Sequence, residues 1–189
     1  MKDLLNFGEM LSVHARLSPN RTGARDLERA MTFAQWNERS CRLANALLGL
    51  GLAKGDRVAI LAYNCVEWCE IFAATAKAGL VALPINFRLV GKEVQFIVDN
   101  AEASALIVQD EMIGIVEEIR KGLSIKSDRF IHFGTQPCPA GRHSALRRCY
   151  RQHRRGPSAS DRELLRWRDR HRQRDQWRPS EITSRIVQR

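Results

Sequence analysis

Between residues 57 and 133, short apolar runs alternate with longer amphipathic segments, and this alternation restricts the fold more than any other feature of the chain. The run at residues 58–62 is apolar at every position, so a strand there would bury both faces and would need a sheet covered on both sides. Each segment between two runs is long enough for one helix, which predicts right-handed βαβ crossovers. We therefore expect an α/β fold, a parallel sheet with helices on both faces. The strands are expected at residues 58–62, 80–83, 105–108 and 129–133. Pro84 is expected to end the second of these strands.

Individual residues mark where the helices should begin and end. Thr32 and Gln35 have the spacing of a capping box, in which each side chain accepts from the backbone N–H of the other residue. Asn64 and Glu67 repeat this spacing, so Asn64 is expected to cap the next helix. Gly79 is expected to end that helix because glycine tolerates the left-handed conformation of a helix stop. The expected helices are residues 4–17, 33–50, 65–78, 90–100 and 113–123.

The net charge of the chain, +10, lies entirely behind residue 133. Residues 1–133 contain 16 basic and 16 acidic side chains, whereas residues 134–189 contain 15 arginines, no lysine and 5 acidic side chains. The second segment is also poor in aliphatic residues, and such a composition favours disorder. We therefore expect two parts, an α/β subdomain at 1–133 and a disordered, Arg-rich basic tail at 134–189.

The cysteine count and the distribution of apolar residues bear on the compartment. Five cysteines are odd in number and show no C-x-x-C spacing, which favours free thiols in a reducing compartment; they are Cys41, Cys65, Cys69, Cys138 and Cys149. No apolar run reaches the length of about 18 residues that a bilayer span requires. The first residues carry Asp3 and Glu9 within an amphipathic pattern, unlike a secretory signal. A cytoplasmic location is expected.

Three blocks with preserved order and spacing resemble a known family. They are MTFAQWNERSCRLANALLGLGLAKGDRVAILAYN (31–64), EWCEIFAATAKAGLVALPINFRL (67–89) and KEVQFIVDNAEASALIVQDE (92–111). Together they are similar to the N-terminal region of the adenylate-forming acyl-CoA synthetases, also called AMP-dependent synthetases. The resemblance implies part of the large N-terminal domain of an enzyme that uses ATP, Mg²⁺ and CoA to convert a fatty or other carboxylic acid into its acyl-CoA through an acyl-adenylate. It leaves the acid and the oligomeric state open.

The resemblance also implies which parts carry the chemistry, and we assign none of them in this chain. The family requires a Ser/Thr/Gly-rich phosphate loop with a lysine, an acidic Mg²⁺ ligand, an adenine-binding strand and a catalytic lysine in a small C-terminal domain. We therefore predict no catalytic, cofactor-binding or metal-binding residue, no bound cofactor and no ligase activity for the chain by itself.

Three positions are candidates for a site, and we interpret each of them as structural. Asn86-Phe87-Arg88 follows the carboxyl end of a strand and matches a loop common in the family, but a structural turn is the preferred interpretation. His14 and His132 have no catalytic partner recognisable in the sequence.

Three explanations of the tail and of the chain's role stay open. The preferred one is that the tail is an out-of-frame translation of a longer synthetase gene. Arginine codons of the CGN type, read one nucleotide later, encode Val, Ala, Asp, Glu or Gly. The arginines of the tail would then become residues that are ordinary in a globular protein. In the second, arginines interleaved with Trp167 and Trp177 form a basic arm that binds nucleic acid without sequence preference. In the third, the chain is a non-catalytic fragment that binds a partner.

Overall fold

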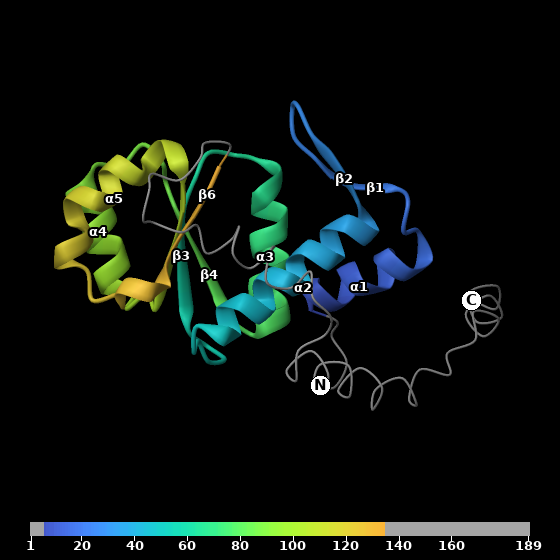
Figure 1. Cartoon of the computed structure of the whole chain (residues 1–189), viewed down its shortest axis with the longest axis horizontal. Helices are drawn as coiled ribbons and strands as arrows, with labels where there is room; N and C mark the ends of the chain where they lie inside the picture. The colour runs from blue at the N-terminus through green and yellow to red at the C-terminus, as the bar shows by residue number, and fades with distance from the viewer. Residues whose placement is uncertain (1–5, 135–189) are drawn as a thin grey trace, which may run out of the picture. The chain divides into compact units, whose positions relative to one another are not determined.

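The computed structural model describes residues 6–134, and its centre is a parallel sheet of four strands (Figure 1). The strand order is β4-β3-β5-β6, and every neighbouring pair is parallel. The bounds are β3 Arg57–Leu61, β4 Val81–Ile85, β5 Ala105–Gln109 and β6 Phe130–Phe133. All four strands fall where the apolar runs predict them, and the α/β class is confirmed.

Helices cover both faces of this sheet, α2 and α3 on one face and α4 and α5 on the other (Figure 1). The handedness of the crossovers explains the division. The chain leaves β3 toward β4 in one direction across the sheet, and then crosses back from β4 to β5 and on to β6 in the opposite direction. The bounds are α2 Phe33–Gly49, α3 Val66–Ala78, α4 Gly91–Asn100 and α5 Ile113–Ile119.

Strand β3 shows why the apolar run had to be continuous. Val58 and Ile60 belong to the core cluster shared with α2 and α3, whereas Ala59 and Leu61 belong to the cluster shared with α4 and α5. All four side chains have no exposed surface. The prediction of a sheet covered on both sides is therefore confirmed.

The N-terminal part packs outside α2 and α3 and consists of a helix and a two-stranded antiparallel hairpin. They are α1 Phe7–Leu17, β1 Thr22–Arg25 and β2 Ala30–Thr32. A third core cluster, which includes Leu11, Met31, Trp36 and Ala73, joins this part to α2 and α3. The helix was predicted, but the hairpin was not.

Two local predictions are wrong. Pro84 lies inside β4, opposite Ile60, rather than at the end of the strand. This is possible because β4 is an edge strand, where a proline can face its missing N–H away from the neighbouring strand. Asn64 does not cap α3, whose N-cap residue is Cys65, with no side-chain hydrogen bond of its own.

The other helix boundaries agree with the sequence patterns or differ by a turn. The Thr32–Gln35 capping box is present, and Gly79 ends α3 with a φ of 70°. The segment expected to be one helix at 113–123 is α5 followed by a short 3₁₀ turn; the 3₁₀ turns are Asp110–Met112, Arg120–Gly122 and Ser127–Arg129. The predicted disordered tail lies outside the described residues. Within residues 6–134, no helix is both long and apolar enough to cross a membrane.

Candidate functional site

The carboxyl edge of the sheet is the place where an open α/β fold binds ligands, at the point where strand order reverses. In this chain the reversal lies between β3 and β5, because β3 connects outward to β4 on one side and β5 connects outward to β6 on the other. The candidate site is therefore built from the residues that follow these strands.

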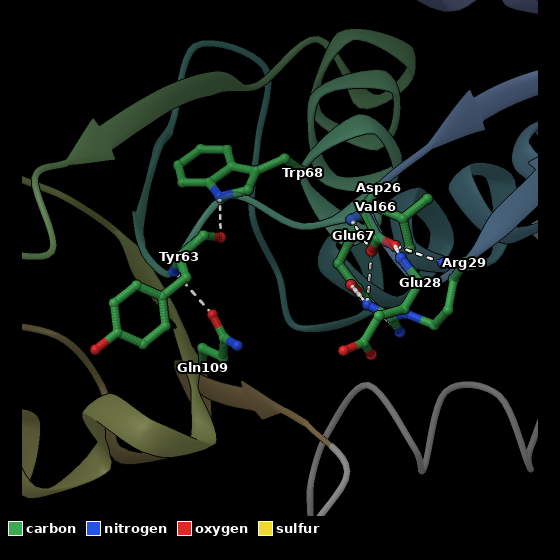
Figure 2. Close-up of polar contacts among 8 residues, drawn as sticks. All are labelled: Asp26, Glu28, Arg29, Tyr63, Val66, Glu67, Trp68 and Gln109. Carbon is green, nitrogen blue, oxygen red and sulfur yellow. Dashed lines mark hydrogen bonds and ion pairs between the residues drawn. The ribbon is translucent and has the colours of Figure 1, made fainter.

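The chain's own groups bridge this reversal point. The backbone N–H of Tyr63, which follows β3, donates to Gln109 Oε1 at the end of β5, with an N–O distance of 2.8 Å. Trp68 Nε1 of α3 donates to the Tyr63 carbonyl, also at 2.8 Å. Figure 2 shows Tyr63 held between the indole and the amide. Both backbone groups of Tyr63 thus have protein partners at the point where a ligand would otherwise bind.

Beside Tyr63, the turn after β4 contributes an aromatic ring and a cation. Phe87 meets the Tyr63 ring edge-on with a centroid distance of 4.8 Å, and the Arg88 guanidinium lies 5.6 Å from the Phe87 centroid. Asn86 Oδ1 accepts from the Arg88 N–H at 3.0 Å, which fixes the turn. The sequence correctly predicted a turn, and it missed the ring contacts because they depend on the strand order.

An imidazole–carboxylate pair lies on the other side of the reversal point. His132 Nδ1 is 3.0 Å from Asp110 Oδ1, and the two side chains are only 15% and 13% exposed. Their proximity follows from the parallel register, in which Val108 is opposite His132 and Asp110 follows at the end of the same strand. The sequence contained no signal for this pair, because the two residues are 22 positions apart. His14, the other histidine considered, stacks on Phe33 of α2 instead, with a centroid distance of 5.1 Å.

A polar network joins the hairpin to the start of α3. Asp26 Oδ2 accepts from the Val66 N–H at 3.1 Å and so caps α3 from a distant segment, the role that the sequence had suggested for Asn64 (Figure 2). Arg29 binds both carboxylate oxygens of Glu67 at 2.6 and 2.8 Å. Hydrogen bonds from the backbone N–H groups of Arg29 and Glu28 lower the pKa of Asp26 to about 2. The carboxylate is therefore ionised at neutral pH, and its role is to hold the hairpin on α3.

The thiols next to this network have raised pKa values. Burial raises the pKa of Cys65 to about 12, and burial also raises the pKa of Cys69. A thiol with such a pKa has almost no thiolate at neutral pH, and the thiolate is the form that attacks electrophiles and binds metals. Among the described residues, no three His, Cys, Asp or Glu side chains form a group that would hold a metal ion.

The described edge can therefore stack an aromatic group on Tyr63 and Phe87 and attract an anion through Arg88. At this edge, Gln109 and Asp110 both interact with other groups of the protein, Gln109 with the Tyr63 backbone and Asp110 with His132.

Comparison with known proteins identifies the family. Residues 11–153 match the family model described as AMP-binding enzyme, which is most of the chain. The chain belongs to this family. The resemblance that the three sequence blocks suggested is thereby confirmed.

Curated relatives of the chain include CoA ligases for different acids. The long-chain-fatty-acid–CoA ligase FadD13 of Mycobacterium tuberculosis is 40% identical over 117 residues, which cover 61% of this chain and 23% of that protein. The crotonobetaine/carnitine–CoA ligase of Salmonella typhimurium is 35% identical over 108 residues, covering 57% of this chain and 21% of that enzyme. The chain thus spans about a quarter of the length of these curated relatives.

Solved structures give the same assignment. The anthranilate CoA ligase AuaEII, crystallised with anthranoyl-AMP, superposes with a TM-score of 0.71 at 28% identity, covering 78% of this chain and 28% of that one. The inhibitor-bound N-terminal domain of FACL13 from Mycobacterium tuberculosis superposes with a TM-score of 0.65 at 33% identity, covering 78% of this chain and 36% of that one. Both matches support an N-terminal portion of an AMP-binding enzyme.

Proposed function

We propose that the chain corresponds to the N-terminal part of an ATP-dependent, AMP-forming ligase that converts a carboxylic acid into its acyl-CoA through an acyl-adenylate. The observation that carries the proposal is the family match over residues 11–153, together with relatives that are CoA ligases. Free cysteines at positions 41, 65 and 69 support a reducing, cytoplasmic location.

Within such a ligase, the described residues act as a scaffold. The polar groups at the reversal point bind one another: Gln109 holds the Tyr63 backbone, and Asp110 holds His132. These contacts fix the ends of β3, β5 and β6 at the carboxyl edge of the sheet. The remaining parts of the enzyme would pack against this edge. ATP, Mg²⁺ and CoA belong to the full-length enzyme, because residues 6–134 contain neither a glycine-rich phosphate loop nor a metal-holding cluster.

The test of the scaffold role is a search for adenylation by the purified full chain. The chain is incubated with ATP, Mg²⁺ and a panel of acids that includes a long-chain fatty acid, crotonobetaine, anthranilate and benzoate, and pyrophosphate is measured. We expect no release above a sample without protein, and no heat of ATP binding by calorimetry. Full-length FadD13 with a long-chain acid is the positive control for the assay. Acid-dependent pyrophosphate release by this chain would refute the scaffold role and would place catalytic groups within its 189 residues.

We further propose that the Arg-rich segment is read in a different frame from the ligase sequence that precedes it. The composition changes after Phe133 and the family match ends at residue 153, so the change of frame belongs between these positions. The nucleotide sequence decides the matter. We expect another frame to continue without stop codons and to encode a Ser/Thr/Gly-rich loop ending in lysine, whereas early stops in both other frames would refute the proposal.

A further inference from the structure

Helix α1 carries apolar side chains on the side that it turns to solvent as well as on the side that it packs against α2 and α3. Met10, Val13 and Leu17 have the i, i+3, i+7 spacing that places side chains on one face of a helix. Met10 is 47% exposed and Leu17 is 75% exposed, and Val13 is half-buried. Leu11 is only 3% exposed and belongs to the core cluster shared with α2 and α3. We call Met10, Val13 and Leu17 the outer face of α1.

Hydrogen bonds and one close approach hold α1 in a single orientation. Ser12 Oγ donates to Asn37 Oδ1 of α2 at 3.1 Å. Lys77 Nζ of α3 donates to Ser12 Oγ at 2.6 Å and to the Gly8 carbonyl at 2.9 Å. The lysine stem lies directly against Gly8, because a Cβ atom at that position would lie 2.6 Å from Lys77 Cγ. These contacts prevent α1 from rolling its outer face inward.

The opposite outer surface of the α/β subdomain, formed by α4 and α5, is charged. Its exposed side chains include Lys92, Glu93, Asp99, Glu117 and Glu118. Phe96, which is 70% exposed, is a single apolar side chain of the kind that ordinary protein surfaces contain. A charged surface is suited to water, whereas a helix that is apolar on both sides is typical of one buried between layers of protein. The outer face of α1 therefore indicates a further layer.

The comparison with solved structures indicates which protein supplies that layer. The chain covers 36% of the N-terminal domain of FACL13, so more than half of that domain has no counterpart in the superposition. A domain folds around its own core, and the unmatched part therefore has to pack on the matched part. A membrane is a less suitable occupant, because residues 1–133 carry 16 basic and 16 acidic side chains and have no net charge to attract anionic lipid.

We propose that the outer face of α1 is a docking surface for the remaining part of the N-terminal domain of an AMP-binding enzyme, and that the chain binds this part even when it is a separate polypeptide. The inference rests on the proposed function, and it adds a second contact to the one at the carboxyl edge of the sheet. Docking removes Met10 and Leu17 from water, which is the source of the affinity. The surface that covers them is accordingly apolar at its centre.

The test uses the full chain and a tagged form of FadD13 from which the segment matched by this chain has been removed. The two polypeptides are co-expressed, and the complex is recovered through the tag. We expect the full chain to be retained in equal amount with the FadD13 remainder, and to bind it in calorimetry after separation and mixing. The removed FadD13 segment, co-expressed in the same way, is the positive control.

Matched variants locate the contact. The double variant Met10→Glu, Leu17→Lys places a negative charge near the start of α1 and a positive charge at its end, an arrangement that favours the helix itself. It should weaken binding by about 100-fold, because two apolar side chains no longer enter the interface. Phe96→Lys, at a similarly exposed position on α4, should bind as the wild type does. Circular dichroism of the unbound variants verifies that each is folded.

Several results would overturn the docking surface. One is failure of the chain to bind a remainder that does bind FadD13's own segment; another is equal affinity for the wild type and the double variant. Self-association that depends on Met10 and Leu17 in sedimentation, or binding to phosphatidylglycerol vesicles through them, would assign the face to another occupant. None of these results refutes the proposed function, which is tested by pyrophosphate release from the chain alone.

A single-chain comparison decides the matter if the remainder stays insoluble with either segment. Residues 1–133 then replace the matched segment within full-length FadD13. The double variant should lower the soluble yield of this chimera at least tenfold, whereas Phe96→Lys should not change it. A chimera that is insoluble without any substitution, or equal yields for the two variants, would overturn the proposal.

Discussion

The N-terminal part of the structure, residues 6–32, and the sheet-forming part, residues 57–133, are held together by different forces. In the sheet, β3 is covered on both faces and its apolar side chains have no exposed surface. The N-terminal part shares a smaller apolar cluster with α2 and α3 and depends on polar contacts with α3, from Asp26 to Val66 and from Lys77 to Gly8 and Ser12.

This difference determines how each part can be disturbed. The free energy gained by burying apolar groups is roughly proportional to the area removed from water. The sheet should therefore lose the most stability when a buried methyl group is deleted. A single hydrogen bond contributes less to stability than a buried apolar side chain does, but its whole contribution is lost when one partner is removed or protonated. The sheet should therefore respond to changes in volume, and the N-terminal part to changes in charge.

The largest effect is expected from removing a core side chain of the sheet. Ile60→Ala should lower the free energy of unfolding by about 4 kcal/mol, because Ile60 has no exposed surface and lies between β4 and β5. Met31→Ala in the hairpin should cost only about 2 kcal/mol, since methionine is flexible and its surroundings can collapse more readily. Urea unfolding followed by circular dichroism measures both. Equal losses for the two variants would mean that the two parts do not differ in the way described.

The same division explains which features could be predicted from the sequence. All four strands of the sheet and the helices between them produce local apolar periodicity, and each was predicted within a few residues of its bounds. The hairpin was missed because its strands have only four and three residues and only one buried side chain each, too few for a repeating pattern.

Polar features were predicted only where both partners are close in sequence. The capping box of Thr32 and Gln35 spans three residues and was recognised, whereas the cap that Asp26 provides for Val66 spans 40 and was not. The same reason hides the pairing of His132 with Asp110 and the bridge from Tyr63 to Gln109, which exist only once β3, β5 and β6 lie side by side.

An intermediate effect is expected from Asp26→Asn, which tests the polar attachment. The amide retains one acceptor for the Arg29 N–H but loses the second carboxylate oxygen that accepts from Val66, and it loses the ion pair with Arg29. At pH 7 the variant should melt a few degrees below the wild type in thermal unfolding followed by circular dichroism. Asp128→Asn, at an exposed position in a 3₁₀ turn, is the matched control and should change little.

The pH dependence of this difference has a definite sign. The pKa of Asp26 is about 2 in the folded protein, below the ordinary value of about 3.9, so its stabilisation is fully present above pH 4 and is lost as the pH falls toward 2. The gap in melting temperature between wild type and Asp26→Asn should therefore be constant from pH 7 to pH 5 and should close at lower pH. A gap that persists unchanged at the acid end would show that the charge of Asp26 is not what attaches the hairpin.

The smallest effect is expected within the sheet-forming part, at Glu102 after α4, where one backbone position is strained. Glu102 has a φ of 47°, a left-handed conformation that is unfavourable for glutamate but is adopted more readily by asparagine. Its carboxylate pairs with Arg57 at 2.9 Å on an exposed surface, a contact of little energetic value, and Arg57 also binds the Glu102 carbonyl, which any substitution preserves. Glu102→Asn should therefore raise the free energy of unfolding by about 0.5 kcal/mol. Glu102→Ala removes the same ion pair without relieving the strain and should give no gain in parallel urea unfolding. If the two variants are equally stable, strain at this position does not limit the stability of the sheet.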